Sequence, residues 1–412
     1  MFGKMREIIL GIRDEHITAV RAFVKSPELQ QETGRQIRED CQELLDYVSA
    51  SRFLQIEIDS RSKDNLVSVG EKLSCRLMTA MLRDRHVEAE YVSLSGIIPP
   101  KGSDRLEPGW FKEAAAMFAE RLEACQDRVP VITGFFGVVP GNLIDSGIGR
   151  GYSDLCAVLV AKGLQAERVH IWKEVDGIFT ADPREVANAR CLPTITPSEA
   201  AELTFYGSEV VHNLALALAI EADPAICISV RNVRKPLGKG TEIIPNPLVE
   251  KPLLTLESPD AADSGISSPI SEASTASRMP TAVTTKKGIV VLNVLSNKSS
   301  MSHGFFASLF AILADHDISV DLISTSEVHV SMAISTTSTN AIRIENARKK
   351  LSEEGKVAVL YDMAILSLVG AELKSMTGVA GRMFSVLGNH GINIEMISQG
   401  MRTATALFTI FN

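Results

Sequence analysis

The sequence has no excess of basic residues. Its 42 Lys and Arg are outnumbered by 50 Asp and Glu, which gives a formal net charge of −8. Because binding to nucleic acids and acidic membranes depends on clustered cations that replace counterions, this charge argues against a general binder of either kind. Small anionic substrates remain possible through local groups.

Cysteine motifs and long hydrophobic runs are missing as well. The six cysteines form no Cys-x-x-Cys pair and have no histidine at metal-ligand spacing, so we interpret them as buried or inert thiols. No run approaches the roughly 18 apolar residues that a membrane span needs. The first residues, MFGKMREIIL, do not have the shape of a signal peptide, and we therefore expect a cytoplasmic protein.

The first 250 residues alternate between helix and strand patterns. Apolar residues recur at helical spacing from Met5 to Ser49, and the apolar run at 129–136 is typical of a buried strand. Thr196-Pro197-Ser198-Glu199 has the form of a capping box and predicts a helix start. Over residues 55–244 the alternation predicts a mainly parallel α/β sheet that helices cover on both faces.

The stretch from Gly149 to Arg184 joins a glycine-rich loop to an apolar helix, a short strand and an acidic loop. Glycines let backbone N–H groups approach an anion, and Arg150 among them suits a carboxylate or a phosphate. Ser153 or Asp154 can cap the helix that follows. The loop matches neither the Walker sequence nor the dinucleotide fingerprint, so alone it is a weak signal, and the acidic loop could be ordinary surface.

Glu71 precedes the helical pattern KLSCRLMTAMLRDR and is expected near the N-terminus of that helix. Most carboxylates at such a place only cap the first turn or interact with the helix dipole. A functional interpretation of Glu71 therefore depends on the rest of the site.

Residues 251–285 are rich in Ser, Thr, Ala and Pro and predict a disordered linker between two domains. Beyond the linker lies an internal repeat, whose first unit spans 286–360 and whose second spans 361–412. The matched positions are Gly304, Phe310, Leu313, His316, Ile318, Ile323 and Ser324, which recur as Gly378, Phe384, Leu387, His390, Ile392, Ile397 and Ser398. Units this small bury little core alone, so we expect them to pair with each other or with a second chain.

Together these segments resemble the aspartate kinases, most closely the fungal monofunctional type, over essentially the whole chain. The match is carried by Ser68 to Glu71, TGFFG at 133–137, GRGYSD at 149–154, WKEVDGIFTADPR at 172–184, EAAELTFYGSEVVH at 199–212, and two ACT units containing VDLISTSEVHVSM and INIEMISQG. As a set these motifs are highly specific. The resemblance implies an α/β amino-acid-kinase sandwich, similar to carbamate kinase, in residues 1–250, followed by tandem ferredoxin-like α+β ACT units.

The family's activity implies transfer of the γ-phosphoryl group of ATP, with Mg²⁺, to the side-chain carboxylate of L-aspartate. The product, 4-phospho-L-aspartate, begins the route to threonine and methionine. By position, Arg150 and Asp154 would be catalytic, and Glu71, Arg150, Ser153 and Asp154 would bind aspartate. The ATP site would comprise Lys173, Glu174, Phe179, Asp182 and Arg184. Phosphoryl transfer depends mainly on positioning and charge neutralisation, which suits cations and N–H groups.

The ACT units imply a feedback amino acid and a homo-oligomer formed through them. The matching effector positions are Ser302, Phe305, Val320, Asp321, Ser326 and Glu327. The fungal type points to threonine, although the residues alone do not select it.

The sequence departs from the family pattern at both ends. The family's Lys-Phe-Gly-Gly loop and the strand after it are not in the sequence, and the second ACT unit stops before its closing helix and strand, so we expect a truncated chain. Loss of one preorganised charge typically costs on the order of 10² to 10³ in rate. An alternative function is therefore an amino-acid-sensing regulatory protein without catalysis.

Overall fold

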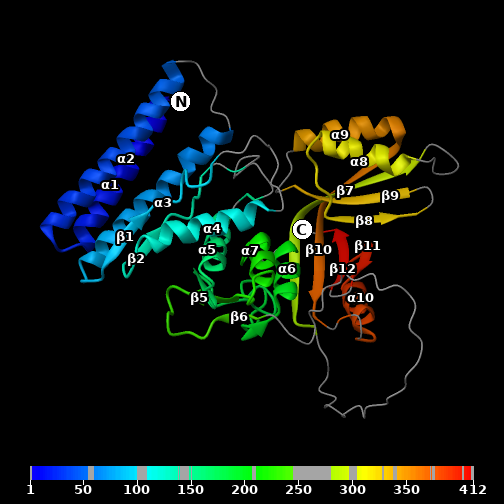
Figure 1. The fold of residues 1–412 in the computed structure, drawn as a ribbon. Coiled ribbons are helices and arrows are strands. Elements are labelled where there is room, and N and C mark those ends of the chain that lie inside the picture. The colour runs from blue at the N-terminus through cyan, green and yellow to red at the C-terminus, as the bar shows by residue number, and fades with distance from the viewer. Residues whose placement is uncertain are drawn as a thin grey trace, which may run out of the picture. The chain divides into compact units, whose positions relative to one another are not determined.

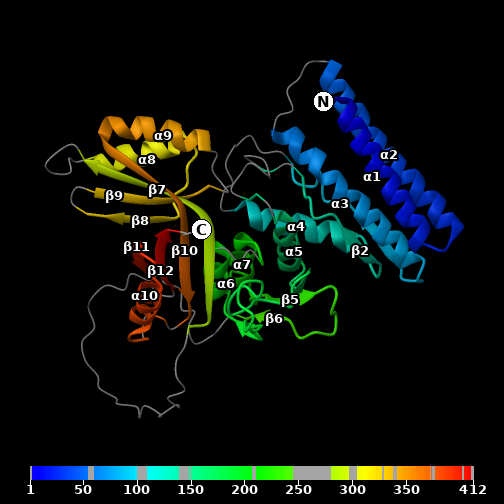
Figure 2. The ribbon, with the colours of Figure 1, turned by 180° about the vertical axis from the view of Figure 1, so that it is seen from behind.

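The computed structural model describes residues 2–53, 60–99, 109–137, 139, 148–149, 151–206, 210–244, 280–296, 304–326, 329–336, 341–371, 373, 376–400 and 403–409. The chain forms two compact units. Unit 1 comprises Met1–Ile171 and Val211–Ser229, and unit 2 comprises Trp172–Val210 and Val230–Asn412. Figures 1 and 2 show the elements of each. Of the helices in the described ranges, none combines the length and the apolar character that crossing a lipid bilayer requires.

Unit 1 begins with three long helices, α1 (Phe2–Phe23), α2 (Pro27–Phe53) and α3 (Ser60–Arg83). The amphipathic helices predicted for Met5 to Ser49 are confirmed. Their apolar faces meet in one cluster around Val20, Ile37 and Leu73, each of which is buried. Figure 1 shows α1 and α2 side by side, with α3 running along them.

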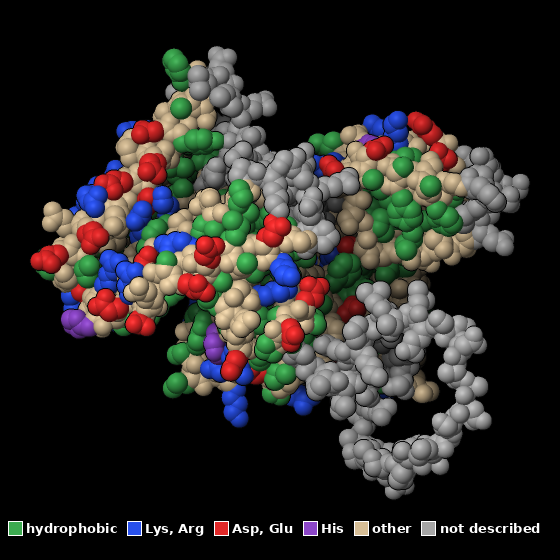
Figure 3. Space-filling model, viewed as in Figure 1, with side chains coloured by type: hydrophobic (Ala, Val, Ile, Leu, Met, Phe, Trp, Pro, Cys, Tyr) green, Lys and Arg blue, Asp and Glu red, His purple; other side chains and the backbone are tan. Residues whose placement is uncertain are grey.

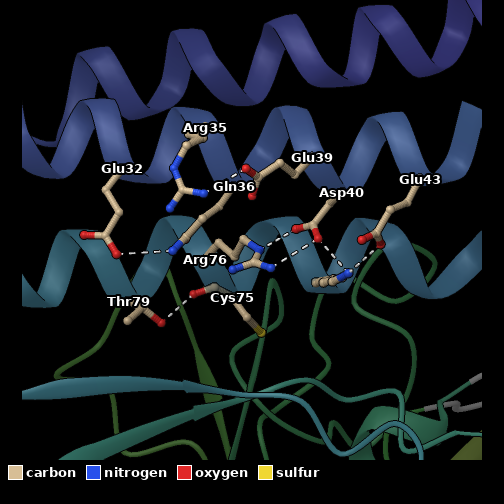
Figure 4. Close-up of polar contacts among 10 residues, drawn as sticks. Glu32, Arg35, Gln36, Glu39, Asp40, Glu43, Cys75, Arg76 and Thr79 are labelled. Carbon is tan, nitrogen blue, oxygen red and sulfur yellow. Dashed lines mark hydrogen bonds and ion pairs between the residues drawn. The ribbon is translucent and has the colours of Figure 1, made fainter.

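A buried ionic network fixes α2 against α3 (Figure 4). Asp40 of α2 is only 4% exposed and accepts hydrogen bonds from the Nε and Nη2 atoms of Arg76 on α3. Lys72 Nζ lies 2.6 Å from the same carboxylate, and the Arg76 guanidinium stacks over the ring of Tyr91, 4.6 Å from its centroid. Because a buried charge is costly unless it is paired, this network holds α3 in one position relative to α2.

The remaining elements of unit 1 are α4 (Trp110–Glu123), α5 (Tyr152–Gly163), α7 (Asn213–Ile220) and the strands β1 (Ala89–Val92) and β2 (Val129–Ile132). The two strands pair in parallel, from Ala89 opposite Val129 to Val92 opposite Ile132. The buried strand predicted over 129–136 is therefore too long, and Val129 is 47% exposed. Its apolar end does not continue the strand, since Phe136 instead packs against Phe118 and Trp110 of α4.

A four-stranded sheet has the order β3-β5-β6-β4, and the unit boundary falls within β3 and β5. Its strands are β3 (Arg168–Lys173), β4 (Thr194–Ile195), β5 (Cys227–Asn232) and β6 (Thr241–Ile243). Strands β4 and β6 pair in parallel. These parallel pairs, between helices, agree with the predicted α/β class.

Helix α6 (Pro197–Phe205) of unit 2 starts with the predicted capping box. Thr196 caps the helix, and the Glu199 carboxylate accepts hydrogen bonds from the Thr196 backbone N–H at 3.1 Å and the Thr196 hydroxyl at 2.8 Å. Glu199 is 5% exposed and also accepts from the Thr281 hydroxyl at 2.6 Å and the Ala371 N–H at 2.8 Å. One carboxylate thus ties α6 to two other segments of unit 2, one at Thr281 and one at Ala371.

The repeat region of unit 2 forms a six-stranded sheet with the order β11-β12-β10-β7-β9-β8. Its elements are β7 (Ala282–Ser296), α8 (Phe305–Asp315), β8 (Leu322–Thr325), β9 (His329–Ser335), α9 (Ala341–Glu354), β10 (Gly355–Val369), α10 (Val379–Asn389), β11 (Ile394–Gln399) and β12 (Thr403–Thr409). The repeat reappears in the helix caps. Gly304 and Gly378 cap the N-termini of α8 and α10 with φ of 95° and 80°. His316 and His390 cap the C-termini, each donating Nδ1–H to a helix carbonyl at 2.8 Å.

Strands β7 and β10 are long enough to serve both repeats. The second half of β7, Ile289 to Leu295, pairs with the first half of β10, whereas Ala282 to Lys286 pair with Ile365 to Val369. In the second repeat, Ala282 to Lys286 therefore take the place of the closing strand, which the first half of β10 provides in the first repeat. The closing strand of the second repeat is thus supplied by residues that the sequence pattern placed at the end of the linker.

Candidate functional site

Glu71 lies in the interior of α3, which begins at Ser60. The predicted place near a helix N-terminus is wrong, because Gly70 does not interrupt the helix. Leu66 and Val69 continue the apolar face of Leu73 and pack in the same cluster, which stabilises the helix on both sides of the glycine. Glu71 is consequently held by a long, packed helix and not by a flexible end.

Gly134 brings Glu71 next to the start of α5. It follows β2, and a Cβ on this residue would lie 2.8 Å from Glu71 Oε2 and 2.8 Å from Ser153 Cβ. Any larger residue would push these two side chains apart. The carboxyl end of β2, α3 and the first turn of α5 therefore meet at Gly134, the kind of place where α/β proteins bind ligands.

Helix α5 starts after Gly151, which takes the left-handed conformation with φ of 87° and makes no side-chain capping bond. The predicted capping of this helix by Ser153 or Asp154 is therefore wrong. Both residues lie in the first turn, and the Gly151 carbonyl accepts from the Asp154 N–H at 3.0 Å. Ser153 is exposed and Asp154 is 9% exposed. The N-terminus of a helix attracts anions.

One oxygen of the Glu71 carboxylate has no hydrogen-bond partner among the described residues. This atom, Oε2, is buried. Burial raises the pKa of Glu71, opposed by contacts with the Tyr152 hydroxyl and with the backbone N–H groups of Phe135 and Gly134. A buried carboxylate oxygen without a partner costs free energy, which a cationic ligand group would recover.

The neighbouring thiol of Cys75 is inert. Burial and the charge of Glu71 raise its pKa to about 11, and its Sγ atom contacts the Ile132 carbonyl at 3.3 Å. Burial likewise raises the pKa of the Cys156 thiol. Because the thiolate is the reactive form, the expectation of unreactive cysteines holds for these two.

A pocket of about 270 Å³ opens beside this part of unit 1. Its wall includes Ser68 and Lys72 of α3, Ser93 after β1, and Thr133 and Phe135 after β2. Thr133 and Phe135 flank Gly134 in the chain. The pocket thus adjoins the turn at which Glu71 and Ser153 meet, and its lining combines polar and apolar side chains.

In unit 2 the expected nucleotide residues follow β3. Lys173 ends that strand, and Glu174 is exposed directly after it. The loop then folds into a hairpin-like turn, since Phe179 forms an isolated antiparallel bridge with Cys191 and the Thr180 N–H donates to the Arg190 carbonyl at 2.9 Å. The sequence thus builds an ordered loop where a hydrophilic surface segment was the alternative.

Asp182 and Arg184 form a closed turn within this loop. The Asp182 carboxylate accepts from the backbone N–H and the guanidinium of Arg184, with Nη2 at 2.7 Å. These bonds lower the pKa of Asp182. The Arg184 side chain is 88% exposed, so its remaining donors face solvent and can reach an anionic ligand.

The base of the loop is fixed by contacts that the sequence did not reveal. The Asp176 carboxylate accepts from Asn232 Nδ2 at 2.6 Å and pairs with Lys235 Nζ at 2.8 Å. Gly177 has φ of 145°, and a Cβ there would lie 2.4 Å from Thr241 Oγ1. Only glycine fits this close approach.

Of the expected effector positions, Phe305, Val320, Asp321 and Ser326 are described. Phe305 is the first residue of α8 and is 5% exposed, and Val320 packs against the same core. The Asp321 carboxylate pairs with Lys286 Nζ at 3.0 Å, and that ammonium lies 5.3 Å from the centroid of the Phe205 ring. Ser326 is exposed and its N–H donates to the His329 carbonyl at 2.8 Å.

Arg150, Ser302 and Glu327 lie outside the described residues. Of the other expected site residues, the structure brings Glu71 and Ser153 together in unit 1, and Asp154 follows Ser153 in the first turn of α5. It places Lys173, Glu174, Phe179, Asp182 and Arg184 along one loop of unit 2. Within the described ranges, no three His, Cys, Asp or Glu side chains gather closely enough to hold a metal ion.

Sequence reasoning missed two side chains of this site, Tyr152 and His212. Tyr152 lies beside Glu71, and its ring packs edge-on against Phe135 with centroids 6.3 Å apart. His212 caps α7 and contacts Ile148. Both residues belong to segments that carry the resemblance, but spacing along the chain gave no sign of what either would touch.

Comparison with known proteins agrees with this arrangement. The family model described as "Amino acid kinase family" matches residues 10–229, and one described as "ACT domain" matches residues 366–410. The aspartate kinase FUB3 of Gibberella moniliformis is 62% identical over 401 residues, covering 97% of this chain and 78% of that protein. The aspartokinase of Schizosaccharomyces pombe is 44% identical, covering 97% and 75%.

Solved structures of aspartokinases are similar to this chain in fold. E. coli aspartokinase III in complex with aspartate and ADP, described as the R-state, superposes with a TM-score of 0.71 at 26% identity, covering 99% of this chain and 92% of that one. The same enzyme with lysine and aspartate, described as the T-state, gives a TM-score of 0.66 at 27% identity, covering 96% and 86%. The sequence identity and the matched fold place this chain in the aspartate kinase family.

Proposed function

We propose that the protein phosphorylates the side-chain carboxylate of L-aspartate with ATP and so forms 4-phospho-L-aspartate. The observation that carries this proposal is the buried, unpartnered Oε2 of Glu71 at the start of α5. A carboxylate oxygen in that state suits an ammonium group, and the N-terminus of α5 beside it suits a carboxylate. An amino acid has both groups. E. coli aspartokinase III, which this chain resembles in fold, is described in complex with aspartate.

In this proposal Glu71 binds the α-ammonium of aspartate and Arg150 binds its α-carboxylate. Ser153 and Asp154, in the first turn of α5, orient the substrate for attack. The side-chain carboxylate of aspartate is already ionised at neutral pH, so it needs no general base, and catalysis consists of positioning and charge stabilisation. Arg150 and Asp154 are accordingly the residues to which we assign the catalytic role.

The nucleotide is proposed to bind at the loop of unit 2. Lys173 and Glu174 stand at its start, and Phe179, Asp182 and Arg184 follow along it. The exposed guanidinium of Arg184, oriented by Asp182, has the donors that phosphate oxygens require. Mg²⁺ would neutralise charge on the phosphates, and it needs no dedicated protein cage, since it is usually bound through one or two carboxylates plus substrate phosphates.

We further propose that the reaction takes place in the cytoplasm and opens the route to threonine and methionine. The curated fungal relatives named aspartokinase support this placement by their similarity over most of the chain. The products of such a step are consumed by enzymes that act on an acyl phosphate, which hydrolyses readily in water.

The activity is tested with the purified protein. With ATP, Mg²⁺ and L-aspartate, we expect an acyl phosphate that hydroxylamine traps as aspartyl hydroxamate, and no signal when any one of the three is omitted. The Glu71→Gln variant serves as the matched negative control. Absence of hydroxamate with the wild-type protein would overturn the proposal, and amino-acid binding without turnover would support the regulatory alternative.

The ACT units are proposed to bind a feedback amino acid through Asp321, whose carboxylate can accept an ammonium group. Threonine is the proposed effector. We expect threonine to inhibit hydroxamate formation and lysine to be much weaker, although the E. coli enzyme is described with lysine in its T-state. A titration of both amino acids in the same assay measures this preference. Inhibition by lysine alone would contradict the choice of threonine, and inhibition by neither would contradict feedback at this site.

We also propose that copies of the chain associate through the ACT units. Figure 3 shows hydrophobic side chains gathered over the region of α8 and β8. The exposed apolar side chains of α8 and β8 include Phe306, Phe310 and Ile323, which are 38%, 43% and 40% exposed. Grouped apolar side chains of this size commonly mark a protein interface. Sedimentation of the full-length protein measures its assembly state.

A further inference from the structure

The imidazole of His212 contacts the chain at two points of the segment that leads into α5, Ile148 and Gly151. Its Nε2 atom lies 2.7 Å from the Ile148 carbonyl oxygen. A Cβ on Gly151 would lie 3.3 Å from His212 Cδ2 and 3.5 Å from its Cβ, so the ring packs against the side of Gly151 that glycine leaves bare. One side chain thus contacts residue 148 before the loop and residue 151 at its end.

The hydrogen bonds of His212 define one tautomer. His212 is the N-cap of α7, and its Nδ1 atom accepts from the Leu214 N–H at 3.2 Å. Nδ1 therefore carries no proton. Nε2 carries the proton and donates it to the Ile148 carbonyl. The neutral ring uses both nitrogens: Nδ1 caps the N-terminus of α7, and Nε2 bonds the Ile148 carbonyl.

We propose that His212 is a positioning residue that clamps the glycine loop in front of α5 and so fixes the helix turn that presents Ser153. The clamp acts on the loop through Ile148 and Gly151, and it does not touch the substrate itself. Gly151 adopts the left-handed conformation with φ of 87°. Because glycine has no Cβ, other backbone conformations are also open to it, and a contact from outside the loop is needed to select this one. The proposal rests on the proposed function, because it assigns the loop to aspartate binding.

The two roles of His212 can be separated by substitution. Asparagine places an acceptor where Nδ1 stands and is a favoured N-cap, but its side chain is too short to reach Ile148. Glutamine places an amide N–H farther out, where it can donate to the Ile148 carbonyl, but it is a poor cap. A clamp therefore predicts that His212→Gln is the milder change, whereas a role limited to capping predicts that His212→Asn is milder.

The experiment compares both variants with the wild-type full-length protein in steady-state kinetics and in amide hydrogen exchange. In His212→Asn we expect the KM for aspartate to rise about tenfold, the loss expected for one hydrogen bond to a positioned group, with the KM for ATP unchanged. In His212→Gln the KM for aspartate should stay within about threefold of wild type. The peptide covering residues 148–155 should exchange faster in the asparagine variant than in the glutamine variant. His16→Asn is the control, since Nδ1 of His16 bonds only the Ile12 carbonyl of its own helix at 2.8 Å.

The outcomes distinguish the clamp from other roles. The clamp would be overturned if the KM for aspartate rose more in His212→Gln than in His212→Asn, or if this KM were equal in the two variants. It would also be overturned if the KM for aspartate and the KM for ATP rose together. Failure of both variants to fold, seen by circular dichroism, would also overturn it, because His212 would then serve the fold of unit 1. If the wild-type protein has no aspartate-dependent turnover, the proposed function fails, while the exchange experiment still decides whether His212 holds the loop.

Discussion

Replacement of Glu71 by glutamine is expected to lower kcat/KM for aspartate by about 100-fold and to leave the KM for ATP unchanged. Removal of one partner from a desolvated charge pair costs about 2 to 5 kcal/mol, and each 1.4 kcal/mol is a factor of ten. The amide keeps the size of the carboxylate but has no charge for the ammonium group. Steady-state kinetics with each substrate varied in turn measures the effect.

The same variant should be at least as stable as the wild type. Burial raises the pKa of Glu71 above that of an unfolded chain, so the folded protein takes up a proton more readily, and the ionised carboxylate costs stability at neutral pH. That cost disappears as the pH falls through the raised pKa, because protonation neutralises the buried carboxylate. The uncharged glutamine side chain does not have this cost at any pH. A lower unfolding temperature for Glu71→Gln would contradict this account. Glu39→Gln, at an exposed position that pairs with Arg35 on the surface of α2, is the control.

The pH dependence of aspartate binding follows from the same shift. Only the ionised form of Glu71 attracts the ammonium group, so the KM for aspartate should rise as the pH falls through the raised pKa, which lies above the usual glutamate range. The Glu71→Gln variant should lack this acid limb in its KM profile.

Replacement of Glu199 by alanine is expected to lower the free energy of unfolding of unit 2 by about 3 kcal/mol. The carboxylate accepts four hydrogen bonds at a buried position, two on each oxygen. Its loss leaves the Ala371 N–H and the Thr281 hydroxyl without a partner, and each buried unsatisfied donor costs about 1 to 3 kcal/mol. Denaturant unfolding followed by circular dichroism measures the change, with the exposed Glu353→Ala on α9 as control.

Glutamine should not rescue this position. Each Glu199 oxygen accepts from two donors. Glutamine replaces one of these oxygens by an NH₂ group, which is itself a donor, so the two donors on that side lose their acceptor. Burial alone would raise the pKa of Glu199, but the bonds from Thr281, Thr196 and Ala371 outweigh it and lower the pKa. The contribution to stability is therefore complete above the unfolded glutamate pKa and is lost as the pH falls through the lowered folded value. A Glu199→Gln variant as stable as the wild type would contradict this account.

Local signals in the sequence predicted local structure well. The capping box at Thr196 to Glu199 forms as expected because its partners lie within one helical turn. The repeat is reproduced even in the caps of α8 and α10, because glycine in the left-handed conformation has few substitutes there. By contrast, Glu71 was expected near a helix N-terminus, whereas packing on both sides of Gly70 continues α3 without a break.

Contacts between distant parts of the chain could not be predicted in this way. The bond between His212 and Ile148 joins residues 64 positions apart, and the one between Glu199 and Ala371 joins residues 172 apart. Hydrophobic periodicity reports which face of an element is buried, but not which element covers it. The resemblance to a family predicted Glu71 and Ser153 as substrate-binding residues, and the structure added Gly134 as the residue that lets them approach each other.

The paired halves of β7 and β10 determine the order in which the nascent chain can fold. The segment from Ala282 to Lys286 emerges first, but its partner, Ile365 to Val369, is made only after the whole first repeat. The first repeat contains all of its own strands and can close as soon as the first half of β10 appears. The second repeat is completed by residues that precede the first repeat in the chain. It therefore depends on contacts of much greater sequence separation, which form more slowly. Until then Ala282 to Lys286 present an unpaired strand edge, the point at which a neighbouring nascent chain could pair wrongly.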